Sequence, residues 1–438
     1  TLFRSKNNFR KIATITLFES AVQWYCFLLY GTAAGTVFHK VFFSQTGNGT
    51  TALILSYMSF AIGYIAGPFG AVFFGHIGDR KGRKVTMYAS LLMMGISTSI
   101  IGILPPAASA GVGVVIVLQL MRLAQCFGRG GTWGGGILMA YENVPENKRS
   151  FYAAIPQIGL PIGFGLSSIL IAVPTLLLPE DIFFTWGWRI PFLAAIILTV
   201  IVIRQKGEMM ETEDYKKAQA KLEAEEAEGK KHKVGFIPMV KGYWKTLLLG
   251  CGTRWVDGTF YNIFIVWILS YCINWLGMPL IQTYIITIIA CIFKIPFTLF
   301  GGWCAQKLGN TRTFVIGALA SAVLSIPTLK VIELSKGNLA ITIIGIVLGW
   351  SIAYNLIWAV ISSLWSSYFE TEVRYSGISF VYHVPSFLVA GMVPTICTLL
   401  INYGKGDTIY VGIYSTVVAL ISAACALALK ARHDRGEK

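Results

Sequence analysis

The sequence predicts an all-α membrane protein with twelve transmembrane helices in two pseudo-symmetric six-helix bundles. Three observations predict it: long apolar runs, a low share of charged residues, and an internal repeat. Of the 438 residues, 55% are hydrophobic and only 13% are charged, which is about half of the charged share of a soluble domain. A soluble fold of this length has too little core to hide so much apolar surface, so the runs are predicted to cross a bilayer.

Each apolar run is long enough to span the hydrocarbon core, which takes about 20 helical residues. The predicted spans are 14–40, 52–76, 85–104, 112–141, 151–178, 185–204, 246–273, 279–304, 313–332, 338–366, 376–402 and 408–430. Between the sixth and seventh spans, glutamates alternate with lysines, which indicates a solvated linker. We therefore expect an N-terminal bundle over 1–204, a cytoplasmic linker over 205–245 and a C-terminal bundle over 246–438.

The formal net charge of +15 raises nucleic-acid binding as an alternative function. The lysines and arginines, however, lie mostly in short segments between apolar runs, and they cluster in alternate connections. Such residues accumulate on the cytoplasmic side of a membrane. We therefore expect both termini in the cytoplasm and no nucleic-acid partner. We also expect a monomer in a bacterial inner membrane.

The cysteines and loops give no sign of catalysis. The eight cysteines lie in or beside apolar runs without a CxxC pair, so neither a metal site nor a disulfide framework is predicted. The sequence has no GxxxxGK[ST] loop for a nucleotide and no nucleophile constellation. We expect no cofactor and no enzymatic activity.

A loop motif recurs in the two halves. Three small or basic positions after the second span recur after the eighth span at one constant offset: they are Gly75, Arg80 and Gly82, matched by Gly302, Lys307 and Gly309. Halves related by an axis along the membrane normal place a solute site between them, near the bilayer midplane. The charges of the first loop either only set the topology or also take part in a conformational change.

These loop residues, with Arg122-x-x-Gln125 in the fourth span, resemble signature motifs of the major facilitator superfamily. More narrowly, five stretches resemble its metabolite:proton symporter group, which includes carriers of citrate, 2-oxoglutarate, shikimate and proline/betaine. They are Gln23-Trp-Tyr-Cys-Phe27, Gly130-Gly-Thr-Trp-Gly-Gly135, Pro156-Gln157-x-Gly159-x-Pro161-x-Gly163, Trp186-Gly-Trp-Arg-Ile-Pro-Phe192 and Val373-Arg-Tyr-Ser-Gly377. The resemblance implies alternating access between the bundles. Its gating motif would consist of Gly75, Asp79, Arg80, Gly82 and Arg83.

Three positions depart from the pattern of that group. Gln23, Cys26 and Thr132 stand where the group usually carries acidic residues. Because these acids are missing, proton symport is expected only from the resemblance, and exchange and uniport stay open.

Ionisable residues at mid-bilayer depth are costly unless paired or hydrated, so each one is a candidate site residue. Arg254, Asp257 and Tyr261 follow i, i+3, i+7 spacing and share a helix face. Arg254 and Asp257 either form a local ion pair that only stabilises packing, or Asp257 carries a proton beside Arg254.

Arg129 lies near the centre of the fourth span with no acid within a helical turn. It either pairs with Glu19 or Asp257 across the interface, or offers its planar fork of donors to a substrate carboxylate. Lys294, in the middle of the eighth span, either extends to the membrane surface or adds a second cation to the site.

Gln157 and His383 occur at nearly equivalent places on proline-containing spans, where a bent helix suits a gate or a site. His383 is either a proton carrier in place of a missing acid or a hydrogen-bonded structural residue. In the tenth span, Asn355 lies among Trp350, Tyr354 and Trp358, which form either a semi-polar site wall or a lipid-facing surface.

The excess of cations at mid-bilayer depth favours a small organic anion, a mono-, di- or tricarboxylate, as the substrate of a secondary transporter, and the resemblance implies that this transport is coupled to protons. The predicted substrate-binding residues are Arg129, Lys294, Arg254, Gln157, Tyr261 and Asn355. The predicted proton-coupling residues are Asp257, His383, Glu19 and Arg122. The alternatives are a zwitterion or osmolyte carrier in which Asp257 meets an ammonium group, an anion exchanger or uniporter, and a receptor-like protein that binds solute without turnover.

Overall fold

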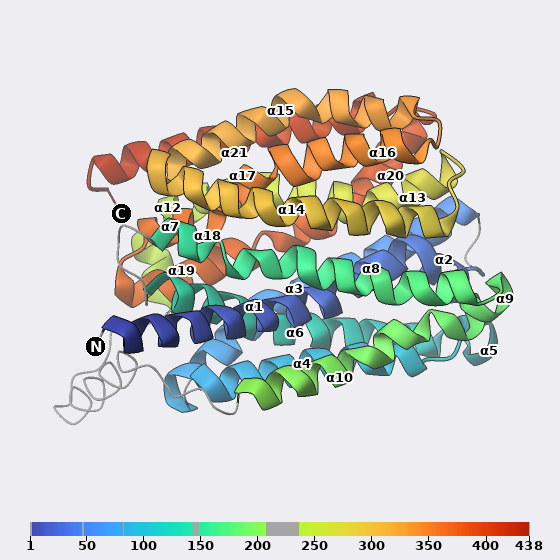
Figure 1. The fold of residues 1–438 in the computed structure, drawn as a ribbon, viewed down its shortest axis with the longest axis horizontal. Helices are drawn as coiled ribbons and strands as arrows, with labels where there is room; N and C mark the ends of the chain where they lie inside the picture. Colours follow the sequence, from blue (N-terminus) through green and yellow to red (C-terminus); the bar gives the residue numbers. More distant parts are fainter. Residues whose placement is uncertain (1, 46–47, 82, 143–148, 207–235, 438) are drawn as a thin grey trace.

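A computed structural model describes residues 2–45, 48–81, 83–142, 149–206 and 236–437 of the chain (Figure 1). Helices make up nearly all of these ranges, and no strand occurs in them. The elements of the first half are α1 (Leu2–Ala33), π-helix η1 (Ala34–Phe38), α2 (His39–Val41), α3 (Gly49–Lys81), α4 (Arg83–Ile103), α5 (Ala107–Ala110), α6 (Gly113–Glu142), α7 (Arg149–Ala153), 3-10 helix η3 (Pro156–Ile158), α8 (Gly159–Leu177), α9 (Glu180–Ile182), π-helix η4 (Phe183–Gly187) and α10 (Arg189–Lys206).

The second half repeats this pattern of long, interrupted helices. Its elements are α12 (Phe236–Asn262), π-helix η5 (Ile263–Trp267), α13 (Ile268–Asn274), α14 (Leu280–Leu308), α15 (Asn310–Leu334), α16 (Leu339–Ile346), π-helix η6 (Val347–Ala353), α17 (Asn355–Trp358), α18 (Ile361–Tyr368), α19 (Thr371–His383), π-helix η7 (Phe387–Gly391), α20 (Val393–Tyr403) and α21 (Ile409–Asp434). Several spans therefore consist of two or three helical pieces joined by a π-helical turn.

Joined end to end, these pieces give the twelve helical segments that the sequence predicts, and the predicted fold class is confirmed. In the described ranges, nine segments are long and apolar enough to cross a membrane by themselves. The bent pair Ser376–His383 and Phe387–Tyr403, which meet at 40°, adds a tenth. That bend lies beside Pro385, as expected for a residue that cannot donate a backbone hydrogen bond.

The predicted linker is described only in part. Residues 207–235 lie outside the described ranges, while α12 already begins at Phe236, inside the predicted 205–245 segment. Tyr243, with φ −118° and ψ 18°, interrupts the helical geometry of α12 near the start of the apolar segment Val240–Asn274. The domain boundaries stay a prediction. The gating motif also stays one, because Gly82 and the side chains of Asp79, Arg80 and Arg83 lie outside what the structure describes.

Both termini lie at one end of the molecule, and the helices run along its long axis (Figure 1). The first-half elements mostly occupy the lower part of this view and the second-half elements the upper part, with α8 beside α14 at the boundary. The halves also meet where α3 contacts η7 and α19, and where α6 contacts α19. These are the contacts that bring the buried charges together.

Glycines let α3 and α6 pack at very short range. A Cβ atom on Gly70 would lie 1.9 Å from the backbone oxygen of Phe127, and one on Gly130 would lie 2.4 Å from the backbone nitrogen of Ala71. Small residues allow such backbone contact in a membrane bundle. The close approach fixes the position of α6, which carries Arg122 and Arg129.

An ion-pair cluster holds the loop between α20 and α21 in the second half. Lys330 Nζ lies 3.0 Å from Glu333 Oε2 and 2.7 Å from Asp407 Oδ1. The backbone N–H of Ile409 also donates to Asp407 Oδ1 at 2.7 Å. The Lys330 ammonium and the Ile409 amide together hold the pKa of Asp407 below its ordinary value. The cluster ties the loop after α20 to the end of α15.

Candidate functional site

Buried cations outnumber buried acids in the described part of the chain. The fully buried charged residues there are Arg122, Arg129, Arg189, Arg254 and Lys294 on one side of the balance, and Glu19 and Asp257 on the other. Arg129 and Lys294 lie near the middle of α6 and α14, at the depth that is farthest from both membrane surfaces. The imbalance predicted from the sequence is therefore present in the folded core.

Arg254 and Asp257 form a buried ion pair. Arg254 Nη1 contacts Asp257 Oδ2 within one turn of α12, as the i, i+3 spacing predicts. Tyr354, next to η6, donates its hydroxyl to the other oxygen, Asp257 Oδ1. Both carboxylate oxygens are thus occupied, so Asp257 meets a cation on one side and a hydroxyl donor on the other.

Tyr382 connects this pair to Arg129 across the two halves. Arg129 Nη2 donates a hydrogen bond to the Tyr382 hydroxyl. The ring of Tyr382 lies 4.4 Å from Arg254 Cζ, a cation–π distance. Arg129 also lies 3.8 Å from the ring centre of Phe27 and 4.7 Å from that of Trp24. Aromatic faces and one hydroxyl, rather than a carboxylate, surround the Arg129 guanidinium.

Of the two alternatives for Arg129, the structure does not show the pairing with Glu19 or Asp257 in the described ranges. In the described ranges Arg129 forms no salt bridge, because Asp257 is engaged by Arg254 on α12. Arg129 Nε has no hydrogen-bond partner there. Thr132, one of the positions where an acid was expected, lies one turn away and donates only to the Arg129 carbonyl at 3.1 Å.

Lys294 does not extend to the membrane surface. Its side chain is fully buried, and Nζ donates to Asn355 Oδ1 at 2.9 Å. Nζ also lies 4.6 Å from the Trp350 ring and 4.4 Å from the Tyr354 ring. Asn355 returns a hydrogen bond from Nδ2 to the Lys294 carbonyl at 2.8 Å. Of the two alternatives left open for the tenth span, its aromatic side chains follow the first: Trp350, Tyr354 and Trp358 are buried and do not form a lipid-facing surface.

Tyr354 joins the Lys294 wall to the ion pair, since it touches both Lys294 and Asp257. One network of contacts then runs from α6 of the first half into α19, α12, α17 with the preceding Tyr354, and α14 of the second half. Its members are Arg129, Tyr382, Arg254, Asp257, Tyr354, Lys294 and Asn355. Five of these seven residues were predicted site residues.

Gln157 and Tyr261 lie beside this network through tryptophans. Gln157 and Trp358 exchange hydrogen bonds across the halves: Trp358 Nε1 donates to the Gln157 carbonyl at 3.0 Å, and Gln157 Nε2 to the Trp358 carbonyl at 3.3 Å. Trp24 stacks edge-on against both Trp358 and Tyr261, at 5.4 and 5.7 Å between ring centres. Because Trp24 also contacts Arg129, Tyr261 is one residue away from the charged network, and Gln157 is two residues away, through Trp358 and Trp24.

His383 faces the first half. A Cβ atom on Gly67 of α3 would lie 2.8 Å from His383 Nδ1, so the imidazole fills the space that this glycine leaves. Its ring packs edge-on against Tyr382 at 4.9 Å, and its buried Nε2 has no hydrogen-bond partner in the described ranges. His383 is therefore next to the network but is not held in place by a hydrogen bond at Nε2.

Arg122 lies in a cage within the first half. The rings of Phe27, Tyr30 and Phe60 surround its guanidinium at 4.4–4.6 Å, and Nη1 donates to Gln125. Arg122 therefore does not contact the charged network directly, and its assignment to proton coupling stays a prediction. Glu19 is buried on α1, five residues before Trp24, or about 7 Å along the helix.

Sequence reasoning missed two residues. Tyr382 was not a candidate, although its position next to His383 on a proline-containing span was a usable signal. Arg189 is buried at the end of the molecule away from the termini, where Nη1 donates to the carbonyls of Gly102 and Leu104 at 2.9 and 2.6 Å. It ties α10 to the end of α4 and does not reach the network.

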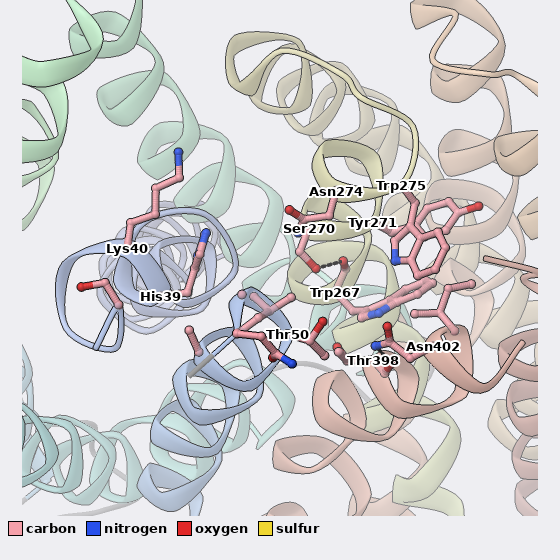
Figure 2. A pocket seen from close by; sticks show the side chains of 16 residues that line it. His39, Lys40, Thr50, Trp267, Ser270, Tyr271, Asn274, Trp275, Thr398 and Asn402 are labelled. Atoms are coloured by element: carbon pink, nitrogen blue, oxygen red, sulfur yellow. Dashed lines mark hydrogen bonds between the residues drawn. The ribbon is translucent and has the colours of Figure 1, made fainter. Parts of the chain in front are cut away.

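A cavity of about 650 Å³ lies between the halves (Figure 2), next to α2 and α13 at the end opposite the termini in Figure 1. None of the predicted site residues lines it. Beneath it, the Tyr57 hydroxyl on α3 contacts Ser270 Oγ at 2.7 Å and the Val266 carbonyl at 3.3 Å. A Cβ atom on Gly35 would lie 3.1 Å from the same carbonyl, so η1 and η5 touch there. These contacts separate the cavity from the charged network.

Two six-helix halves around a buried, charged interface define the class of membrane carriers with internally repeated bundles. The family model "Major Facilitator Superfamily" matches residues 24–394. The chain therefore belongs to the Major Facilitator Superfamily, as the sequence motifs predict.

The relatives of the chain are metabolite transporters. It is 33% identical to the "Inner membrane metabolite transport protein YhjE" of Escherichia coli (strain K12), covering 98% of this chain and 96% of the relative. It is 31% identical to the "Shikimate transporter" of the same organism, covering 96% and 94%. The chain is accordingly a multi-pass membrane transporter of a metabolite.

The solved structures confirm the fold. The xylose transporter XylE from E. coli, in a partially occluded inward-open conformation, superposes with a TM-score of 0.72 at 14% identity, over 96% of this chain and 97% of the other. At that identity the likeness concerns the fold alone, and the substrate has to be argued from the residues of this chain.

Proposed function

We propose that the chain carries a small organic anion across the inner membrane by alternating access, with both termini in the cytoplasm. The observation that supports this proposal is the state of Arg129 and Lys294. Both are buried near mid-membrane, and neither forms a salt bridge in the described ranges. A buried charge without a counter-charge is costly, and an anionic substrate would supply the missing one.

Arg129 would bind the substrate carboxylate in place of the Tyr382 hydroxyl. A guanidinium offers two parallel N–H groups to a carboxylate, whereas a phenol oxygen occupies only one. The Arg129 Nε atom has no partner in the described ranges, so part of this fork is available. Arg129 belongs to α6 and Tyr382 to α19, so the exchange would also break a contact between the halves.

Lys294 would supply a second cation, with Gln157, Tyr261 and Asn355 as polar groups around the substrate. Asp257 is the group we assign to proton coupling, with His383 and Glu19 as further candidates. Asp257 contacts Arg254 and Tyr354 at the same time. Because Arg254 packs on the Tyr382 ring, movement of Tyr382 would change the surroundings of the Asp257 ion pair.

The experiment is uptake by proteoliposomes of labelled shikimate, 2-oxoglutarate, citrate, betaine and xylose. We expect uptake of at least one of the three acids. Arg129→Ala should reduce that uptake by about 10- to 100-fold, the value of one to two charge-assisted hydrogen bonds. Arg204→Ala, which removes an exposed arginine at the end of α10, should leave it unchanged. Equal uptake by the Arg129→Ala carrier and the wild type would remove Arg129 from the site.

A zwitterion carrier is the second candidate. The observation in its favour is that opposite charges lie near Tyr382. Arg129 contacts Tyr382 directly, and Asp257 pairs with Arg254, which packs on the ring of Tyr382. Betaine uptake that exceeds the uptake of all three acids would support this candidate over the anion carrier.

A further inference from the structure

The cavity away from the termini has the composition of a binding site. Residues of α2 and of the first turn of α3 line it from the first half, and residues of η5, α13 and α20 line it from the second half (Figure 2). Its lining includes Lys40 and His39, the aromatic side chains of Trp267 and Trp275, and the amides of Asn274 and Asn402. No aspartate or glutamate belongs to the lining, so the described wall of this cavity carries positive charge only.

Lys40 is held loosely. Its side chain is 53% exposed, and Nζ lies 3.5 Å from Oε1 of Glu180, whose side chain is 81% exposed. Exposed ion pairs of this kind contribute little to stability. Nζ also lies 4.3 Å from the centre of the Phe184 ring. A carboxylate from solution can therefore replace Glu180 at little cost.

The rest of the lining fits the carbon body of an organic acid. Trp275 is 42% exposed and presents an indole to the cavity, which suits an apolar body or a ring. Asn274 and Asn402 are exposed and offer amide groups to substrate hydroxyls or to a second carboxylate. Tyr57 and Ser270 close the bottom of this cavity, so a ligand here would wait above the charged network.

We infer that this cavity is a capture site for organic carboxylates on the outer face, in which Lys40 exchanges Glu180 for the carboxylate of the arriving substrate. The inference rests on the proposed function, including its orientation, and it adds a second site on the same path. Capture at this site raises the local substrate concentration above the Tyr57–Ser270 contact. It should therefore act on the half-saturation concentration and leave the maximal rate unchanged.

The test measures initial uptake of labelled shikimate, 2-oxoglutarate and citrate by intact cells that express the full chain, at low ionic strength. Lys40→Gln should raise the half-saturation concentration of the transported acid by about two- to fivefold. Glu180→Gln, which removes the competitor, should lower it by about twofold. Lys336→Gln is the matched control, because Lys336 is exposed at the same end but does not line the cavity.

The opposite signs of the two variants exclude a merely structural effect, since damage to the fold would move both in the same direction. At about 0.5 M salt, where the screening length falls to a few ångströms, the three variants should converge. If the wild type takes up an acid, two results would overturn the capture site alone. One is a half-saturation concentration that is the same for Lys40→Gln and Lys336→Gln. The other is a shift of this concentration in the same direction for Lys40→Gln and Glu180→Gln. No uptake of any of the three acids by the wild type would overturn the proposed function, and the capture site with it.

Discussion

The guanidinium of Arg129 and the hydroxyl of Tyr382 meet across the two halves of the transporter, from the middle of α6 to the last turn of α19. The ring of the same tyrosine packs on Arg254. Tyr382 therefore separates two arginines and occupies the position that we assign to the substrate carboxylate. Whatever binds Arg129 from the central path has to displace this hydroxyl.

Replacement of Tyr382 by phenylalanine should tighten carboxylate binding. The change removes the hydroxyl that competes for Arg129 but keeps the ring on Arg254. A hydrogen bond of this kind contributes about 0.5–1.5 kcal/mol, so we expect the dissociation constant of the transported acid to fall by about two- to tenfold. Equilibrium binding to the purified carrier measures this. Unchanged affinity would show that substrate and Tyr382 do not share Arg129.

Asp257→Asn should abolish substrate accumulation driven by a proton gradient while exchange of substrate across the membrane continues. The asparagine cannot carry a proton, but it retains a polar contact for Tyr354. Because the single change leaves Arg254 buried without its partner, a change that costs about 3–5 kcal/mol, the double variant Arg254→Gln with Asp257→Asn is the control for folding. Gradient-driven accumulation by both variants would exclude Asp257 as the coupling group.

Asn355→Asp should impair transport of anions as strongly as Lys294→Gln does. The new carboxylate would stand where Asn355 Oδ1 accepts from Lys294 Nζ at 2.9 Å, and it would neutralise the second cation without removing it. We expect both variants to lose about tenfold or more in uptake of a di- or tricarboxylate. Uptake kinetics for acids with one, two and three carboxylates measure this. An Asn355→Asp carrier with wild-type rates would place Lys294 outside the substrate path.

Gly130→Ala should destabilise the first half. The added methyl group would lie 2.4 Å from the backbone of Ala71 and force α3 and α6 apart, at a cost of about 1–3 kcal/mol. Gly113→Ala on the same helix has nothing within 4 Å of its new Cβ and should have little effect. Thermal unfolding of the two variants in detergent distinguishes them. Equal melting temperatures would contradict the close packing.

The Asp407 carboxylate should stabilise the fold at neutral and mildly acidic pH and lose this effect only in strong acid. Its pKa is lowered in the folded state by Lys330 and by the Ile409 amide, so its contribution is complete above the unfolded pKa of about 3.9 and is lost as the pH falls through the folded value. Asp407→Asn should melt below the wild type at pH 7 and approach it below about pH 4. Asp181→Asn, at an exposed position in α9, is the control. A gap that persists at low pH would assign the effect to packing.

The fold could be predicted from the sequence because a long apolar run in a bilayer is stable as a helix, in which its backbone groups bond to one another. Helix spacing also predicted the Arg254–Asp257 pair, since both residues lie on one face of one helix. It failed for Arg129, because its partner Tyr382 lies more than 250 positions away in the other half. Periodicity indicates which face of a helix is buried and does not indicate which side chain of another helix meets it.

The π-helical turns were not predictable for a related reason. A wide turn such as η1 or η5 arises where one extra residue is accommodated against a neighbouring helix, and the contact between η1 and η5 depends on both halves being assembled. The same applies to Lys294. Its length and charge were compatible with reaching the surface, and only the positions of Trp350 and Asn355 hold it inside.

The aromatic surroundings of Arg129 bear on what the carrier does after it has released its cargo. The rings of Phe27 and Trp24 make cation–π contacts with the guanidinium, and the Tyr382 hydroxyl accepts a hydrogen bond from it. These contacts stabilise the charge of Arg129 when no acid is bound. An unloaded carrier that is stabilised in this way can change between its inward-open and outward-open conformations without bound substrate. We therefore expect net movement down a gradient into vesicles that contain no exchangeable solute, rather than an obligatory one-for-one swap.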